Sequence, residues 1–139
     1  MRKILVATDG SPYSEKAIEK AIEMAKKDDV EIIVVNVAED YCPMGLAEMD
    51  CETIRDLVMK ESKGIMSSAL ERFKSAGITA RGIIETGSPA DTIIELAKRE
   101  KTDEIVIATH GRHGAKKFVM GSVTERVIEF APCPVLVVK

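Results

Sequence analysis

Glycines, hydroxyls and positive charge gather in residues 108–124, and this combination suits an anion. Gly111 and Gly121 let the backbone approach a ligand closely. A helix predicted to begin at Ser122 offers unpaired N–H groups and the positive end of its dipole. The hydroxyl and basic side chains of this stretch include Ser122, Thr124, Arg112, Lys116 and Lys117. We therefore predict that a phosphate group binds here.

The same residues also have a purely structural interpretation. Ser122 and Glu125 match a capping box, in which each side chain binds a backbone N–H of the other residue. Gly121 would then allow a tight turn, and the basic residues would form a solvated face of the loop. The two interpretations are compatible, because the other N–H groups at the helix start stay free. Neither the dinucleotide pattern G-x-G-x-x-G after the first strand nor the P-loop pattern G-x4-G-K-[ST] is present.

Few residues indicate catalysis. His110 and His113 lie in the predicted phosphate loop, where a histidine serves as a loop donor or acts on a phosphate. No motif places a second carboxylate beside Asp9, so a metal pair is not indicated. Asp9 would either bind one Mg²⁺ bridged to phosphates or form an Asx turn ahead of Ser11. We assign no catalytic residue and no metal ligand.

Short apolar runs alternate with amphipathic stretches that would position these residues. Strands are predicted at residues 4–7, 32–37, 79–85, 104–108 and 135–138. Helices are predicted at residues 12–27, from about 50 or 53 to 76, after Ser88 as far as Arg99, and at 122–130. Ser11 and Ser88 are the expected N-caps, and Asp91 is the expected partner of Ser88 in a capping box. Gly77 is expected to end the second helix. Residues 39–49 and 109–120 are predicted loops.

This alternation predicts one α/β domain over residues 1–139, a five-stranded parallel sheet with helices on both faces. Ligands of such open sheets bind at the carboxyl ends of the strands, where the strand order switches. Three segments follow predicted strands at such ends, namely residues 8–10, 37–39 and 109–111. We expect the binding site where these segments meet.

Composition excludes several other classes of protein. The net charge is only −3 and aromatic residues make up 4% of the chain, so nucleic acid is not an expected partner. The three cysteines, at positions 42, 51 and 133, have neither an even count nor C-x-x-C spacing, which predicts reduced thiols. Cys42 and Cys51 flank a predicted loop, and a redox role is the alternative for these two residues. The apolar run after Met1 is too short for a signal peptide or a membrane span. We expect a soluble cytoplasmic protein.

Four blocks of the chain resemble the universal stress protein family, and the resemblance extends along essentially its whole length. They are residues 4–11 (ILVATDGS), 109–112 (THGR), 121–125 (GSVTE) and 131–138 (APCPVLVV). The nucleotide-binding branch of the family carries the pattern G-x2-G-x9-G-[ST]. Gly111, Gly121 and Ser122 match it at full spacing, and Ala108 stands at its first glycine. The methyl group of Ala108 is the departure from the pattern.

The resemblance implies a Rossmann-like fold of the adenine nucleotide alpha hydrolase type, with strand order 3-2-1-4-5. It implies ATP, ADP or AMP as the ligand, with Mg²⁺ a possible companion. By this resemblance Asp9 lies near adenine and ribose, the backbone of Val37 recognises adenine, and Ile107 lies beside it. The full set of implied binding residues is Ala7, Thr8, Asp9, Val37, Ile107, Ala108, His110, Gly111, Arg112, Gly121, Ser122, Val123 and Thr124.

Three functions remain open from the sequence. The first is a homodimer that binds adenine nucleotide and acts as a stress-response switch, with an unidentified protein partner. The resemblance implies pairing through the last strand, Val135 to Val138, and an apolar strand at a sheet edge does seek a partner. The second is an interaction dimer that binds no nucleotide, and the third is a slow ATPase. The glycine spacing favours the first.

Overall fold

The computed structural model describes residues 1–39, 42, 48–111 and 120–139. Predictions made for Arg112, His113, Lys116 and Lys117 therefore concern residues outside the described part of the chain. None of the helices in the described part combines the length and the apolar character that crossing a membrane requires.

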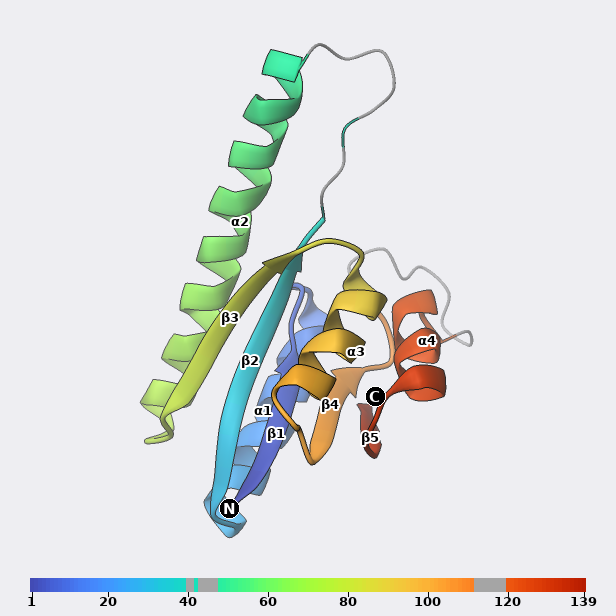
Figure 1. Ribbon diagram of the computed structural model, residues 1–139. Coiled ribbons are helices and arrows are strands. Elements are labelled where there is room, and N and C mark those ends of the chain that lie inside the picture. The colour runs from blue at the N-terminus through green and yellow to red at the C-terminus, as the bar shows by residue number, and fades with distance from the viewer. Residues whose placement is uncertain (40–41, 43–47, 112–119) are drawn as a thin grey trace.

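Five parallel strands form one sheet in the order β3-β2-β1-β4-β5, which confirms both the predicted parallel sheet and the implied strand order (Figure 1). The strands are β1 (Arg2–Ala7), β2 (Val30–Ala38), β3 (Ala80–Thr86), β4 (Glu104–Ala108) and β5 (Val135–Val138). β1 lies between β2 and β4 at the centre. Its alternate residues Ile4 and Val6 face one core, and Leu5 and Ala7 face the other. This two-sided burial explains the continuous apolar run.

Helices cover both faces of the sheet (Figure 1). They are α1 (Pro12–Lys27), α2 (Glu48–Ser75), α3 (Pro89–Arg99) and α4 (Ser122–Phe130). α1 and α2 pack on one face, where Ile18 and Phe73 are fully buried. α3 and α4 pack on the other, where Leu96 and Val127 are buried. The order of strand and helix is the predicted one, and the largest boundary difference is at α2, which begins before the expected residue 50.

The helix ends follow local chemistry at two positions. The Ser11 side chain accepts a hydrogen bond from the Ser14 N–H, so the predicted N-cap of α1 is confirmed. Gly77 has φ +78°, and the Ile78 N–H donates to the Phe73 carbonyl, which ends α2 where predicted. Both signals are confirmed because they act over only a few neighbouring residues.

Two predicted capping boxes are wrong. Ser88 occupies the N-cap of α3 but makes no side-chain cap, since the Asp91 carboxylate instead accepts from Arg126 Nε at 2.8 Å. At α4 the N-cap is Gly121, so Ser122 is already the first helical residue and cannot cap with Glu125. In the first case a contact between α3 and α4 competes with the local cap, and in the second the helix begins one residue earlier than the box requires.

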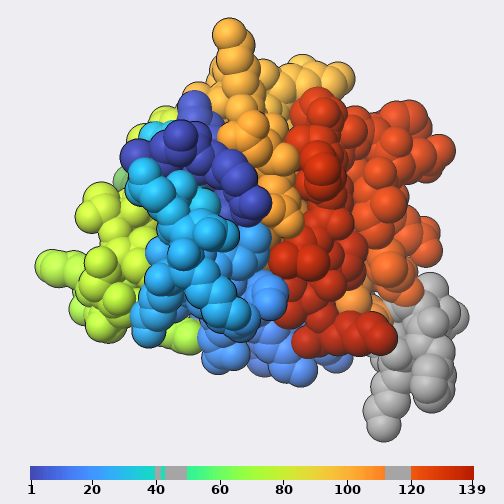
Figure 2. All heavy atoms as spheres, turned by 90° about the horizontal axis from the view of Figure 1, so that it is seen from below, coloured from blue at the N-terminus to red at the C-terminus, as the bar shows by residue number. Residues whose placement is uncertain are grey.

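The amino edge of the sheet is closed by contacts to the start of the chain. Figure 2 shows the first residues (dark blue) against the turn before β2 and the segment before β4. The Lys3 N–H donates to the Asp103 carboxylate at 2.8 Å, and the Asp103 N–H donates to the Lys3 carbonyl at 2.8 Å. The amino ends of the strands are therefore held together by their own polar groups. We look for a ligand site at the carboxyl ends of the strands.

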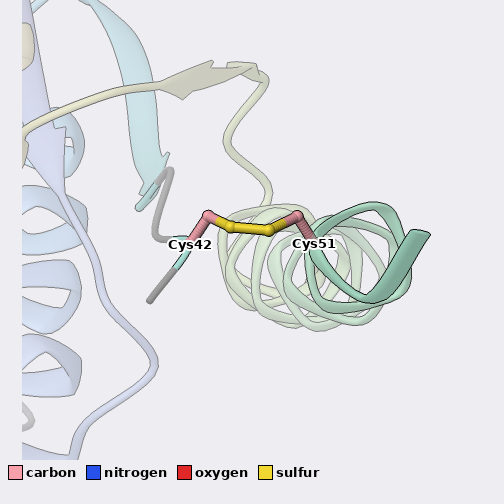
Figure 3. The surroundings of a disulfide bond; sticks show 2 residues. All are labelled: Cys42 and Cys51. Carbon is pink, nitrogen blue, oxygen red and sulfur yellow. A yellow bond between two sulfur atoms is a disulfide. The ribbon is translucent and has the colours of Figure 1, made fainter. Parts of the chain in front are cut away.

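Cys42 and Cys51 form a disulfide, so the prediction of reduced thiols is wrong for these two residues (Figure 3). The bond joins the segment after β2 to the first turns of α2, and the Cα atoms are 5.4 Å apart, within the usual range for a disulfide. Cys133 is the free cysteine. The count is odd because Cys133 lies in the bend before β5 and takes no part in the bond, whereas the fold brings together Cys42 and Cys51, which are nine residues apart.

We expect Cys42→Ser to lower the free energy of unfolding by about 2–3 kcal/mol, because the disulfide closes a short loop and restricts the unfolded chain. Chemical denaturation without reductant measures it. Reduction should destabilise the wild type to the same extent and leave Cys42→Ser unchanged.

Cys133→Ser is the matched control for this prediction. Burial, aided by Asp103 and Glu104, raises the pKa of the Cys133 thiol, and this residue makes no disulfide. The unfolded oxidised chain should expose one titratable thiol, and the reduced chain all three. Three thiols without reductant would show that the disulfide does not form.

Candidate functional site

A cavity of about 420 Å³ opens at the carboxyl ends of β1, β2 and β4. It lies where the sheet order switches, because the chain leaves β1 toward β2 while β4 lies on the opposite side of β1. The connections from these two strands diverge and leave space between them. The volume is in the range of small-ligand sites.

The cavity brings together the site residues that the sequence predicted, except Arg112, which lies outside the described residues. The predicted residues that line it are Ala7, Thr8, Asp9, Val37, Ile107, Ala108, His110, Gly111, Gly121, Ser122, Val123 and Thr124. They come from three separate parts of the chain. The predicted meeting of the segments after β1, β2 and β4 is thus confirmed.

The turn after β1 is built around Asp9 and Gly10. Asp9 Oδ1 accepts a hydrogen bond from the Ser11 N–H at 2.9 Å, which is the Asx turn that the sequence offered as the structural role of Asp9. Gly10 has φ +81°, and a Cβ there would lie 2.9 Å from Ile65 Cγ1. Both facts require glycine at this position. The turn holds the Asp9 carboxylate at the cavity wall.

Gly111 allows the Asp9 carboxylate to approach the segment after β4. A Cβ on Gly111 would lie 2.7 Å from Asp9 Oδ2, closer than a carbon and an oxygen tolerate. A Cβ on Gly121, by contrast, would have the Thr109 carbonyl oxygen as its nearest neighbour, at 3.4 Å. Of these two pattern glycines, Gly111 is thus the one required by direct contact within the chain.

Gly121, the N-cap of α4, carries no side chain, and no side-chain cap is made at this helix start among the described residues. The first N–H groups of a helix have no acceptor within the helix itself. The Gly121 N–H donates to the Thr109 carbonyl at 2.8 Å and holds this start against the end of β4. Thr124 differs from its predicted role as a hydroxyl donor to a ligand. Its buried Oγ1 donates to the Ala108 carbonyl at 2.7 Å, which commits its only proton. Thr124 can therefore offer a ligand its backbone N–H.

His110 lies at the cavity rim with two neighbours. Its Nδ1 is 3.1 Å from Thr109 Oγ1, and its ring centroid is 5.3 Å from that of Tyr13 at a tilt of 44°. Packing against Tyr13 orients the imidazole, which can contact a ligand through its ring edge.

One wall of the cavity was not predicted as part of the site. Val58, Glu61, Ser62 and Ile65 of α2 line the cavity. The spacing of these positions places them on one face of a helix. Ala38 and Glu39 belong to the predicted segment after β2, and the remaining lining residues that were not predicted are Ser14, Val35, Asn36, Pro89 and Ile93. Helical spacing predicts that this face of α2 packs against the rest of the protein. Only the fold shows that part of this face lines a cavity.

The described lining carries three carboxylates, Asp9, Glu39 and Glu61, and none of its described members is Lys or Arg. Within the described residues, no group of three or more His, Cys, Asp or Glu side chains is placed to hold a metal ion. The carboxylate side suits ligand groups that donate hydrogen bonds. The uncapped start of α4 suits an anionic group.

Comparison with known proteins agrees with this geometry. A model of the universal stress protein family matches residues 1–139. Universal stress protein MJ0531 of Methanocaldococcus jannaschii is 37% identical over 139 residues, which cover 99% of this chain and 82% of that protein.

Two solved structures have the same fold. One is the universal stress protein of Archaeoglobus fulgidus in complex with dAMP, at 26% identity and a TM-score of 0.72, covering 100% of this chain and 98% of that one. The other is a universal stress protein in complex with cAMP, at 26% identity and a TM-score of 0.76, covering 99% and 97%. The chain belongs to the universal stress protein family.

Proposed function

We propose that this protein binds an adenine nucleotide, AMP or ATP, in the cavity at the carboxyl ends of β1, β2 and β4. The observation that carries the proposal is the pairing, in one cavity, of a carboxylate turn at Asp9 with the uncapped start of α4. A nucleotide has a hydroxyl-bearing half, which the Asp9 turn suits, and an anionic half, which the start of α4 suits. The relatives in complex with dAMP and cAMP support the same ligand class.

The base fits against the end of β2. The Thr8 N–H donates to the Val35 carbonyl, so the backbone groups of Val35 point toward β1. Those of Val37, two residues on, point the same way. At that level β1 has already ended, and the cavity takes its place. The Val37 backbone can therefore meet the polar edge of adenine, while the side chains of Val37 and Ile107 supply apolar walls.

The sugar and phosphates fit the other two segments. In this proposal the Asp9 carboxylate accepts hydrogen bonds from ribose hydroxyls. The phosphates would lie at the N–H groups of Ser122, Val123 and Thr124, where the helix dipole also favours negative charge. A Mg²⁺ ion accompanying ATP would bind between the phosphates and Asp9. We propose that occupancy of the cavity is the signal of a stress-response switch.

We expect AMP to bind the wild type and Asp9→Asn to weaken binding about tenfold or more. The asparagine keeps the oxygen that accepts from Ser11 and loses the charged acceptor for ribose. Isothermal titration calorimetry measures both affinities, and mass spectrometry of the denatured protein detects co-purified nucleotide.

Asp29→Asn is the matched control, since Asp29 is exposed in the turn before β2 at the opposite edge of the sheet. Its affinity should equal that of the wild type. A wild type that arrives empty and gives no heat with AMP or ATP would contradict the proposed function.

We expect Gly111→Ala to weaken AMP binding more than Gly121→Ala, because only the first substitution forces the Asp9 carboxylate to move. The same crowding should lower the free energy of unfolding by about 1–2 kcal/mol in Gly111→Ala, whereas Gly121→Ala should change it by less than about 0.5 kcal/mol. Thermal denaturation and calorimetry of both variants provide the measurement. Equal effects on affinity would mean that the contact between Gly111 and Asp9 does not shape the site.

We also propose that the protein forms a homodimer through the free edge of β5. β5 pairs only with β4 among the described strands, and its four residues are half-buried in the single chain. Because the Ile105 N–H donates to the Pro134 carbonyl and the Thr109 N–H to the Val138 carbonyl, the backbone groups of Val137 point away from β4. A second copy can pair with this edge.

We expect light scattering to give twice the mass of one chain for the wild type and the mass of one chain for Val137→Pro, which lacks the outward N–H. Circular dichroism establishes that the variant is folded. Leu57→Ala is the control, because Leu57 is an exposed apolar residue of α2, and it should remain dimeric. A folded Val137→Pro dimer would contradict pairing through this edge.

A further inference from the structure

Asn36 is a buried amide at the wall of the cavity. It lies on β2 beside Val37, its side chain is 4% exposed, and it lines the cavity. Its Oδ1 atom makes no hydrogen bond within the part of the chain that the structure describes. Buried acceptors of this kind are rare in folded proteins, because losing water without gaining a partner is costly.

The orientation of the amide follows from its one hydrogen bond. Asn36 Nδ2 donates to the Thr8 carbonyl oxygen at 2.9 Å. A carbonyl oxygen is only an acceptor, so rotating the amide by half a turn would place two oxygens against each other. Nδ2 must therefore face Thr8, and Oδ1 must face away from it.

The hydroxyls of Ser14 and Thr8 have no proton left for Oδ1. Ser14 Oγ donates to the Ser11 carbonyl at 2.9 Å. In the 3.1 Å contact between Ser14 Oγ and Thr8 Oγ1, Thr8 must then be the donor. Both protons are used within the turn after β1, and the Gly10 N–H also points at Thr8 Oγ1. A donor to Asn36 Oδ1 has to come from outside this network.

We propose that Asn36 Oδ1 accepts a hydrogen bond from the nucleoside half of the ligand, either from the exocyclic amino group of the base or from a ribose hydroxyl. This inference rests on the proposed nucleotide binding. Asn36 is then a specificity-determining residue, because a site with a buried acceptor discriminates against ligands that lack the donor. The Nδ2 bond to Thr8 holds the acceptor still while the ligand enters.

The test compares ligands that each lack one donor. Calorimetry is performed on the wild type and on Asn36→Leu with AMP, purine riboside 5′-monophosphate (no amino group), 2′-deoxy-AMP and 3′-deoxy-AMP. In the wild type, the analogue without the relevant donor should bind about tenfold more weakly than AMP. In Asn36→Leu that analogue and AMP should bind with equal affinity. The analogue whose affinity equals that of AMP in Asn36→Leu, but not in the wild type, identifies the ligand group that donates to Asn36 Oδ1.

A merely structural role for Asn36 would produce a different pattern, namely an equal loss for all four ligands. That result, or no loss at all, overturns the inference while AMP binding by the wild type upholds the proposed function. A wild type that binds none of the four overturns both. Asn36→Ala is the second variant if leucine disturbs the fold, and it should give the same pattern.

Thr102→Val is the matched control. Thr102 Oγ1 is the other buried side-chain atom without a partner among the described residues, and it precedes β4 at the opposite edge of the sheet. Removing it should leave the ranking of the four ligands unchanged. A changed ranking would show that any unpaired buried group alters binding, and would overturn the specific role of Asn36.

Discussion

The site depends on one topological constraint, the position of β1 between β2 and β4. β1 is followed by α1 on one face of the sheet and β4 is followed by α4 on the other, so the chain leaves these two neighbouring strands in opposite directions. Backbone cannot fill the space between the two exits. The cavity is the consequence, and its described lining comes from the strand ends and from residues of the four helices.

Polar groups at the exits of β1 and β2 are satisfied by one another. The Asx turn of Asp9, the hydroxyl pair of Thr8 and Ser14, and the amide of Asn36 form a continuous network that replaces the lost sheet ladder. Such networks define a unique geometry because each donor has one acceptor. The exception in this network, Asn36 Oδ1, lies at the cavity wall, where a ligand can complete the set.

The disulfide extends this rigidity to the edge of the site. Cys42 follows the end of β2, which supplies Val37 and Glu39 to the cavity, and Cys51 lies on α2, which supplies Val58 and Glu61 (Figure 3). One covalent bond thus joins the segment after β2 to α2, and both β2 and α2 contribute residues to the lining. The cysteine count alone concealed this pairing, since count and spacing do not report which thiols meet in space.

The sequence by itself determined the order of elements, the central strand buried on both faces, the cap at Ser11 and the meeting of three strand-end segments. These features depend on short-range patterns and on the fixed geometry of parallel sheets. Only the tertiary structure decided that the Thr124 hydroxyl donates to the Ala108 carbonyl and that Asp91 pairs with Arg126 instead of capping α3. It also decided that α2 forms a wall of the cavity. The physical reason is that each of these contacts joins residues distant in sequence, and a side chain chooses its partner from what the fold places within reach.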